Sequence, residues 1–124
     1  YYQGEDLDYV ADYHQLTIDE VINLHSKKLY HVLFLGFVPG FPYLHGLNSQ
    51  LFTPRRDNPR VSVPKGAIAI GADQTGIYPE DSPGGWHIIA HTDACLFDAK
   101  AANPCLFKPG DTIEFVPVKG VNHD

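Results

Sequence analysis

Glycine and proline are distributed unevenly along this chain of 124 residues. All ten prolines and ten of the eleven glycines follow residue 35, whereas residues 1–28 contain only Gly4. Proline fixes φ and lacks a backbone donor, and glycine adopts the conformations that tight turns require. The later region is therefore restricted to short elements joined by turns. The sequence predicts a helical lead-in at 1–28, followed by short strands.

Residues 1–28 have the periodicity of two short helices. One helical face comprises Leu7, Val10, Ala11 and His14. Thr17 and Glu20 have the spacing of a capping box, and the apolar face of the helix that it starts continues to His25. We expect two helices, joined by a turn near residues 15–17, that cover one end of the strands.

From residue 29 onward, short apolar runs alternate with turns. The predicted strands are 29–35, 67–71, 86–90, 94–97 and 112–118, and residues 108–111 form a tight turn. The helices precede the strands instead of alternating with them, which argues against a parallel sheet with crossover helices. The predicted fold class is mainly β (α+β), a closed or nearly closed β-barrel preceded by two short helices.

Charge and apolar patterning argue against several partners. The net charge of −6 disfavours nucleic acid, because phosphate binding draws on Lys and Arg. No apolar run approaches the ~20 residues of a membrane span, so we expect no membrane contact. We also expect no signal peptide, and therefore a cytoplasmic location. The seven histidines lack metal-ligand spacing, so no metal is expected. Cys95 and Cys105 are expected to be buried thiols.

Three segments are predicted to be irregular loops because of their glycine and proline content, and they hold the candidate binding residues. Residues 36–46 place large apolar side chains on a stiff backbone, residues 53–65 contain four cations, and residues 74–86 mix polar side chains with glycines. The apolar side chains of the first segment either pack inward as core or form the rim of a groove, and both can hold for different side chains. The predicted groove comprises Phe37, Pro39, Phe41, Pro42, Tyr43, Gln74, Tyr78, Trp86 and His91.

The cations of residues 53–65 either pair with nearby acids at the surface or capture a carboxylate. Arg56 and Arg60 are the candidates for a bidentate carboxylate contact. Gln74 and Tyr78 could orient such a ligand, and Glu80 could act as a general base. No nucleophile motif occurs in the sequence, so we expect no complete active site in this chain alone.

The chain resembles one known family in four segments: FLGFVPGFPYLHGL (34–47), TPRRDNPRVSVPKGAIAI (53–70), QTGIYPEDSPGGWHIIAHT (74–92) and LFDAKAANPCLFKPGDTIEF (96–115). They resemble the carboxyl-terminal domain of the allophanate hydrolase subunit 1 family. That family includes the B subunit of bacterial 5-oxoprolinase, also known as the Kip-type inhibitor of a sporulation histidine kinase, and the chain looks closest to the Bacillus-type inhibitor. The resemblance implies a single cyclophilin-like barrel over 1–124, from a longer protein whose amino-terminal domain is absent here.

The resemblance also implies a function. It predicts a module that binds a sensor histidine kinase and inhibits its autophosphorylation, from a protein that is also part of ATP-dependent 5-oxoprolinase. The implied partners are that kinase, a second subunit of related fold that resembles the C subunit of 5-oxoprolinase, and a small carboxylate such as 5-oxoproline. No cofactor is expected in this domain, and ATP is implied for the full complex. The alternative is an amide hydrolase subunit that resembles allophanate hydrolase, with a small-carboxylate site and no kinase role.

One position departs from the family pattern. Many relatives read Gly-Arg-Thr after the strand that follows SPGGW, whereas this chain reads Ala90-His91-Thr92. If that arginine holds a ligand carboxylate in relatives, a histidine holds it weakly once it is neutral, above about pH 6.5. Proline isomerase activity does not follow from a cyclophilin-like fold, because function belongs to the site.

Overall fold

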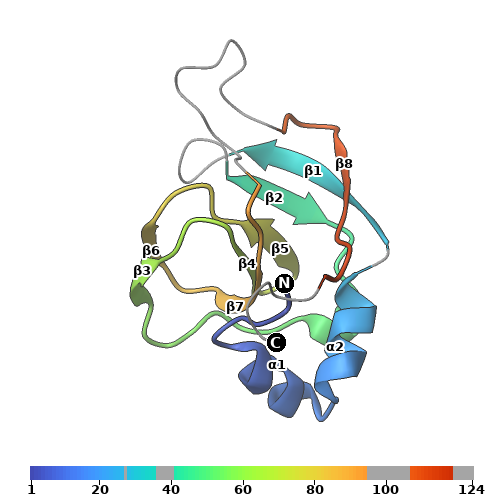
Figure 1. Cartoon of the computed structure of the whole chain (residues 1–124), viewed down its shortest axis with the longest axis vertical. Coiled ribbons are helices and arrows are strands. Elements are labelled where there is room, and N and C mark those ends of the chain that lie inside the picture. The colour runs from blue at the N-terminus through green and yellow to red at the C-terminus, as the bar shows by residue number, and fades with distance from the viewer. Residues whose placement is uncertain (27, 36–40, 95–106, 119–124) are drawn as a thin grey trace.

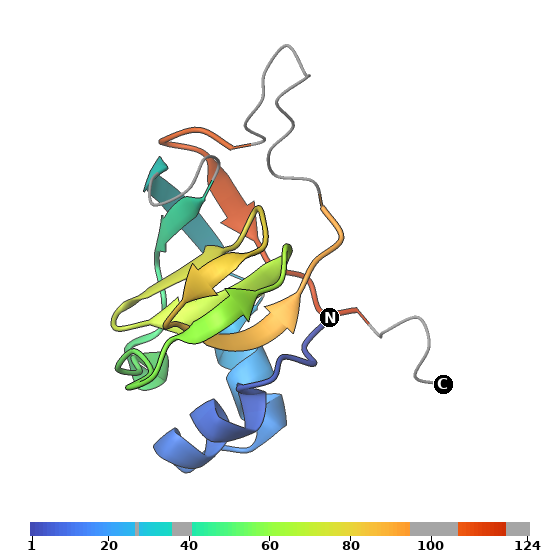
Figure 2. The ribbon, with the colours of Figure 1, turned by 90° about the vertical axis from the view of Figure 1, so that its left-hand side faces the viewer.

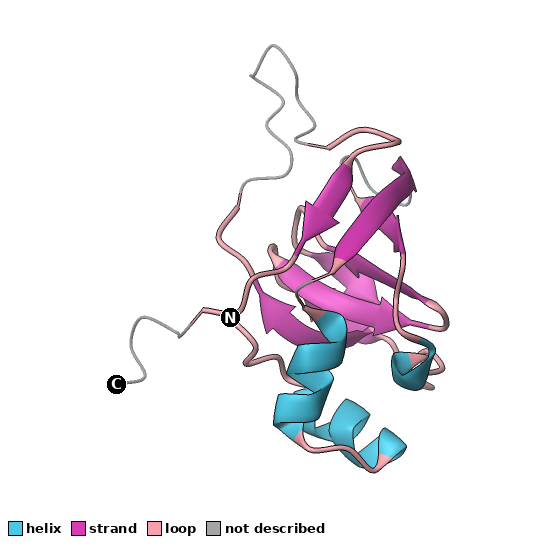
Figure 3. Cartoon of the chain, turned by 90° about the vertical axis from the view of Figure 1, so that its right-hand side faces the viewer, coloured by secondary structure: helices cyan, strands magenta, loops and turns pink. Residues whose placement is uncertain are grey.

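The computed structural model describes residues 1–26, 28–35, 41–94 and 107–118. Two helices open the chain, α1 (Leu7–His14) and α2 (Ile18–His25), and they lie together at one end of the molecule (Figures 1 and 3). The helical lead-in predicted from the sequence is confirmed. In the described ranges, neither helix is long and apolar enough to cross a membrane.

The capping box predicted at the start of α2 is formed. The backbone N–H of Glu20 donates to the Thr17 hydroxyl at 3.1 Å, and the N–H of Thr17 donates to the Glu20 carboxylate at 2.8 Å. The first of these bonds satisfies a donor that the opening helical turn leaves unpaired, and together they fix where α2 begins. Helix α1 ends at Gln15, which takes a left-handed conformation with a φ of 56°.

The described residues contain eight strands, and every pairing between them is antiparallel. One sheet has the order β7-β4-β5-β2-β1-β8, and a second sheet pairs β3 with β6. The first sheet comprises β1 (Leu29–Leu35), β2 (Pro42–His45), β4 (Ala67–Gly71), β5 (Gln74–Ile77), β7 (His87–His91) and β8 (Thr112–Glu114). The second comprises β3 (Arg60–Val63) and β6 (Ser82–Gly84), and a short 3-10 helix, η1 (Ser49–Leu51), follows β2. The predicted mixed α+β class, made mostly of strands, is confirmed.

The two ends of the six-stranded sheet decide whether its strands close into a barrel. Residues 1–6 cover the outer edge of β7, where the Gly4 N–H donates to the Ile89 carbonyl at 3.0 Å (Figure 2). The other end of the sheet is β8, which pairs with β1. Within the described residues nothing pairs β7 with β8, so the sheet is open there and the predicted closed barrel is not observed.

The three segments predicted as irregular loops contain strands. β2 lies in 36–46, β3 in 53–65, and β5 and β6 in 74–86, so the loop predictions are wrong at those positions. Cross-strand pairing outweighs the glycine and proline content of these segments. β2 pairs with β1 on one side and β5 on the other, and Pro42 is its first residue, a position where a strand tolerates proline. Pro83 lies in β6, whose sheet has two strands, so one edge of β6 needs no donor.

Other predicted boundaries move by a few residues. The strands predicted at 29–35 and 67–71 are confirmed as β1 and β4. β7 is shifted by one residue from the predicted 86–90, and β8 ends at Glu114 instead of residue 118. The predicted strand at 94–97 lies mainly outside the described residues. Cys95 and Cys105 lie outside them as well.

Strand β4 divides the core into two parts, because its side chains alternate between the two faces of the sheet. Ile68 and Ile70 belong to the larger part, which includes the buried side chains of both helices. The smaller part, here called the aromatic cluster, comprises Phe41, Val63, Ala67, Ala69, Tyr78, Trp86 and Ile88. The two alanines leave room for large rings, so the alternating sequence AIAI sets the volume available on each face.

His25, the last residue of α2, is fully buried and hydrogen-bonded through both ring nitrogens. The Thr75 hydroxyl donates to the Ala69 carbonyl at 2.8 Å, so it accepts from His25 Nε2, 3.0 Å away. Nδ1 therefore has no proton and accepts from the Tyr2 hydroxyl at 2.6 Å. Burial, reinforced by the charge of Lys28, lowers the pKa of His25 to about 3. This imidazole joins α2 to the sheet in its neutral form.

We predict that His25 stays neutral, with its proton on Nε2, from pH 7.5 down to about pH 4.5. The lowered pKa in the folded state means that its contribution to stability is present above the unfolded value of about 6.5 and is lost as the pH falls. Imidazole ¹⁵N chemical shifts measured against pH would check this. Titration of His25 near pH 6.5 would contradict the network.

Tyr2→Phe removes the hydroxyl that donates to His25 Nδ1. We expect it to lower the free energy of unfolding by about 1–3 kcal/mol, which urea denaturation would measure.

Candidate ligand-binding site

A pocket of about 220 Å³ opens beside the aromatic cluster, and we call it the aromatic pocket. It is lined by Phe41, Tyr43, Arg55, Arg56, Pro59, Tyr78, Gly84, Gly85 and Trp86. These residues come from all three of the segments that the sequence singled out. The fold therefore brings five of the predicted residues together, namely Phe41, Tyr43, Tyr78, Trp86 and Arg56.

The rings of the pocket pack edge to face around Phe41. Its ring centroid lies 5.0 Å from that of Tyr78 and 5.6 Å from that of Trp86, with interplanar angles of 88° and 84°. Tyr43 lies 4.9 Å from Phe41 and 5.8 Å from Trp86. Phe41 is 1% exposed, whereas Tyr43 is partly exposed. Phe41 therefore packs as core, whereas the partly exposed Tyr43 lies at the edge of the pocket.

Two glycines allow these rings to pack against the backbone. A Cβ atom at Gly71 would overlap the Trp86 indole, and one at Gly84 would overlap the Tyr78 hydroxyl. Neither glycine has a positive φ, so the requirement is for space and not for an unusual backbone conformation. Gly71 and Gly84 thus serve aromatic packing.

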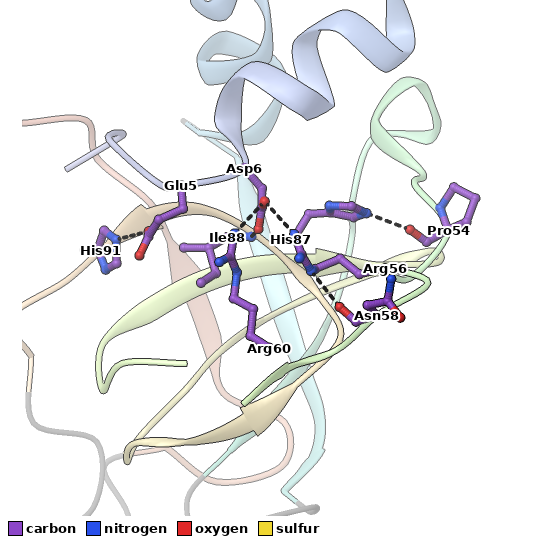
Figure 4. A network of polar contacts seen from close by, with 9 residues as sticks. All are labelled: Glu5, Asp6, Pro54, Arg56, Asn58, Arg60, His87, Ile88 and His91. Carbon is purple, nitrogen blue, oxygen red and sulfur yellow. Dashed lines mark hydrogen bonds and ion pairs between the residues drawn. The ribbon is translucent and has the colours of Figure 1, made fainter. Parts of the chain in front are cut away.

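Asp6 is the centre of a polar network beside the pocket (Figure 4). Its Oδ1 accepts from Arg56 Nη1 at 3.0 Å and from Arg60 Nη2 at 2.8 Å, and its Oδ2 accepts from the Ile88 N–H at 2.9 Å. The Asp6 side chain is 6% exposed, and the two arginine side chains are 28% and 27% exposed. One nearly buried carboxylate therefore binds two arginines and joins the start of α1 to β7.

The network already gives Arg56 and Arg60 a carboxylate from within the chain. Sequence reasoning named both arginines as ligand contacts and missed Asp6. The available signal was an aspartate directly before the apolar face of a helix, at the N-cap position. A residue there ordinarily caps the helix, but the Asp6 side chain makes no capping bond and turns to the arginines instead. Only the folded structure shows that the Asp6 side chain contacts the arginines instead of capping α1.

His87 fixes the beginning of residues 53–65, here called the basic segment (Figure 4). Its Nε2 lies 2.9 Å from the Pro54 carbonyl, which can only accept, so the proton is on Nε2. The imidazole stacks on the ring of Tyr9 with centroids 4.6 Å apart. Burial lowers the pKa of His87, which keeps the ring neutral at pH 7.

Arg55 differs from Arg56 and Arg60 in its surroundings. Its guanidinium carbon lies 6.0 Å from the centroid of the Trp86 ring. Burial raises the pKa of Tyr43 and of Tyr78, and the positive charge of Arg55 partly opposes both rises. Among the residues that the structure describes, no carboxylate forms an ion pair with Arg55. Arg55 therefore lines the aromatic pocket, and also a neighbouring cavity with Asp6 and Asp57, without an ion pair to a carboxylate of the described residues.

The other predicted site residues lie elsewhere. Gln74 pairs with Gly71 in the turn between β4 and β5, at the end of β5 away from Tyr78, and Glu80 is exposed. Pro42 is buried at the start of β2 and does not line the pocket. Phe37 and Pro39 lie outside the described residues.

His91 lies in a different place from the aromatic pocket. Its Nε2 is 3.0 Å from Glu5 Oε1, so it contacts an acid of the chain itself. It lines a second cavity of about 410 Å³ between residues 1–2 and β8, whose apolar lining includes Ile77 and Phe115. Across the described ranges, no three His, Cys, Asp or Glu side chains converge as metal ligands.

Comparison with known proteins identifies the family. Residues 1–107 match the family model described as "carboxyltransferase domain, subdomain C and D". The chain belongs to this family. It is 50% identical over 119 residues to the B subunit of 5-oxoprolinase from Haemophilus influenzae, covering 96% of this chain and 55% of that protein. It is 43% identical over 115 residues to the corresponding B subunit from Bacillus subtilis, covering 93% and 48%.

The chain thus spans about half the length of these curated relatives. A solved structure of a conserved uncharacterized protein from Pyrococcus horikoshii has the same fold, with a TM-score of 0.89 and 46% identity over 93% of this chain and 53% of that one. The predicted resemblance is confirmed for relatives named as the B subunit of 5-oxoprolinase. The narrower likeness to the Bacillus protein is not supported, because its identity is lower than that of the Haemophilus protein.

We predict that Asp6→Asn lowers the free energy of unfolding by about 2–4 kcal/mol, because two partly buried arginines lose their counter-charge. Urea denaturation of the protein would measure this loss. The matched control is Glu5→Gln, which removes the neighbouring carboxylate. Glu5 is 47% exposed in its contact with His91, so the expected loss is at most about 1 kcal/mol. Equal losses in the two variants would contradict the central position of Asp6.

We further predict that Gly84→Ala costs about 1–3 kcal/mol, since its Cβ would force the Tyr78 ring to move. Gly85→Ala is the matched control, because a Cβ there would lie 3.7 Å from Pro59, an ordinary contact. Its effect should stay within about 0.5 kcal/mol. Thermal and urea unfolding of both variants would check the difference. A tolerated Gly84→Ala would show that Tyr78 does not pack as described.

Proposed function

We propose that this chain is a domain of a 5-oxoprolinase B subunit, and that the whole protein takes part in the ATP-dependent opening of 5-oxoproline to glutamate. The observation that supports this most is the 50% identity to a protein of that name over 96% of the chain. In that reaction water adds across the lactam C–N bond, while ATP is hydrolysed to ADP and phosphate. The domain would serve as a binding part of the enzyme.

The composition of the aromatic pocket supports a binding role. Among the described residues, its lining holds aromatic rings, two arginines and glycines, but no carboxylate or histidine to act as a base. Chemistry at the lactam would therefore need groups from outside this domain. The proposed source is the rest of the protein and the second subunit of related fold, with ATP bound by the full complex.

The finer sequence predictions stay predictions. A ligand carboxylate on Arg56 and Arg60 would have to compete with Asp6, which both arginines already contact. Inhibition of a sensor histidine kinase would rest on the rim residue Tyr43, since Phe41 is core and its truncation would leave a cavity. The cytoplasmic location likewise remains a prediction.

The test is reconstitution of the full-length protein with its partner subunits, followed by measurement of ADP and glutamate release. We expect ATP hydrolysis that depends on 5-oxoproline and falls at least tenfold when the protein that contains this chain is left out. Allophanate serves as the alternative substrate. Turnover of allophanate without turnover of 5-oxoproline would replace this proposal with the alternative amide hydrolase, and a complex indifferent to both would refute each of them.

A further inference from the structure

Three arginines lie near the aromatic pocket, but their surroundings differ. Arg56 and Arg60 share the Asp6 carboxylate at 3.0 and 2.8 Å, so their charge is largely compensated within the chain. Arg55 makes no ion pair among the described residues, and it lines the pocket. A cation that faces a concave surface without a counter-charge favours the binding of an anion there.

The backbone on both sides of Arg55 is anchored. On one side, the Pro54 carbonyl accepts from His87 Nε2 at 2.9 Å. On the other, the Arg56 N–H donates to the Gly85 carbonyl at 2.7 Å, and the Arg56 side chain is held by Asp6. Little backbone freedom is left for a ligand to remove when it binds, so the backbone that carries the exposed Arg55 side chain is held in advance.

The rest of the pocket limits the chemical class of the ligand. Its walls are the rings of Tyr43, Tyr78 and Trp86, which suit a compact apolar body. A cationic ligand is disfavoured by the two arginines that line it. A volume of about 220 Å³ lies below the usual range for drug-sized ligands, which begins near 300 Å³. These features fit a small anion with a short, largely apolar ring or chain, and a monocarboxylate of that kind suits the planar guanidinium fork.

We propose that the aromatic pocket is the carboxylate subsite for the substrate, and that Arg55 is the residue that pairs with the carboxylate. The guanidinium fork would bind both carboxylate oxygens, and the ring methylenes would lie against Trp86 and Tyr43. This inference rests on the proposed function for the identity of the substrate, a cyclic monocarboxylate, but not for the existence of the site. It assigns to Arg55 the contact that sequence reasoning gave to Arg56 and Arg60.

The test is calorimetric titration of the full-length protein with 5-oxoproline, and with 2-pyrrolidinone, the same lactam without its carboxylate. We expect Arg55→Ala to raise the Kd for 5-oxoproline about 10- to 100-fold and Arg55→Lys to fall between the two. 2-Pyrrolidinone should bind weakly to the wild type and be indifferent to the substitution. Lys65→Ala, which removes an exposed cation outside the pocket, is the matched control and should change the Kd less than twofold.

An unchanged Kd in Arg55→Ala, or no binding of 5-oxoproline to the wild type, would overturn the inference. In the reconstituted complex, Arg55→Ala should raise the KM for 5-oxoproline and leave the KM for ATP unchanged. A raised KM for ATP alone would mean that the pocket binds nucleotide, which also overturns it. If the complex turns over 5-oxoproline with an unaltered KM in Arg55→Ala, this inference fails while the proposed function stands. Arg55-dependent binding of 5-oxoproline without turnover would support the proposed binding site and refute the proposed function.

Discussion

The contact of Asp6 with Arg56, Arg60 and the Ile88 N–H is the interaction on which the rest of this structure depends. It joins three parts of the chain that are distant in sequence: the start of α1, the basic segment and β7. With Asp6 in place, the basic segment lies against β7, and the aromatic pocket has a fixed wall. The same contact compensates two of the three arginines near the pocket, whereas the third, Arg55, makes no ion pair among the described residues.

A second constraint comes from the alternation of side chains along β4. The isoleucines fill the helix side of the sheet, and the alanines admit Phe41, Tyr78 and Trp86 on the other side. Gly71 and Gly84 remove the last obstacles to ring packing. The pocket is thus a consequence of small residues at defined positions, with its aromatic walls supported from behind by the core.

Much of this arrangement could be predicted from sequence, and the exceptions have physical causes. The capping box of Thr17 and Glu20 is local, so it was found, as were the apolar runs that became β1 and β4. Strands β2 and β5 were missed because cross-strand pairing, which overrides their glycine and proline content, is not local. Arg56 was assigned to a ligand for the same reason: its partner Asp6 lies 50 positions earlier in the chain. Gln74 and Tyr78 are near in sequence, but Gln74 begins β5 and Tyr78 follows its last residue, so they lie at opposite ends of the strand.

We infer that Asp6 keeps Arg56 and Arg60 engaged, so that an incoming carboxylate meets Arg55. The most direct measurement is a crystal structure of the full-length protein with 5-oxoproline bound. The account predicts ligand carboxylate oxygens within hydrogen-bond distance of the Arg55 guanidinium, the lactam ring against Trp86, and the Asp6 contacts intact. A ligand carboxylate bound between Arg56 and Arg60, with Asp6 displaced, would contradict it.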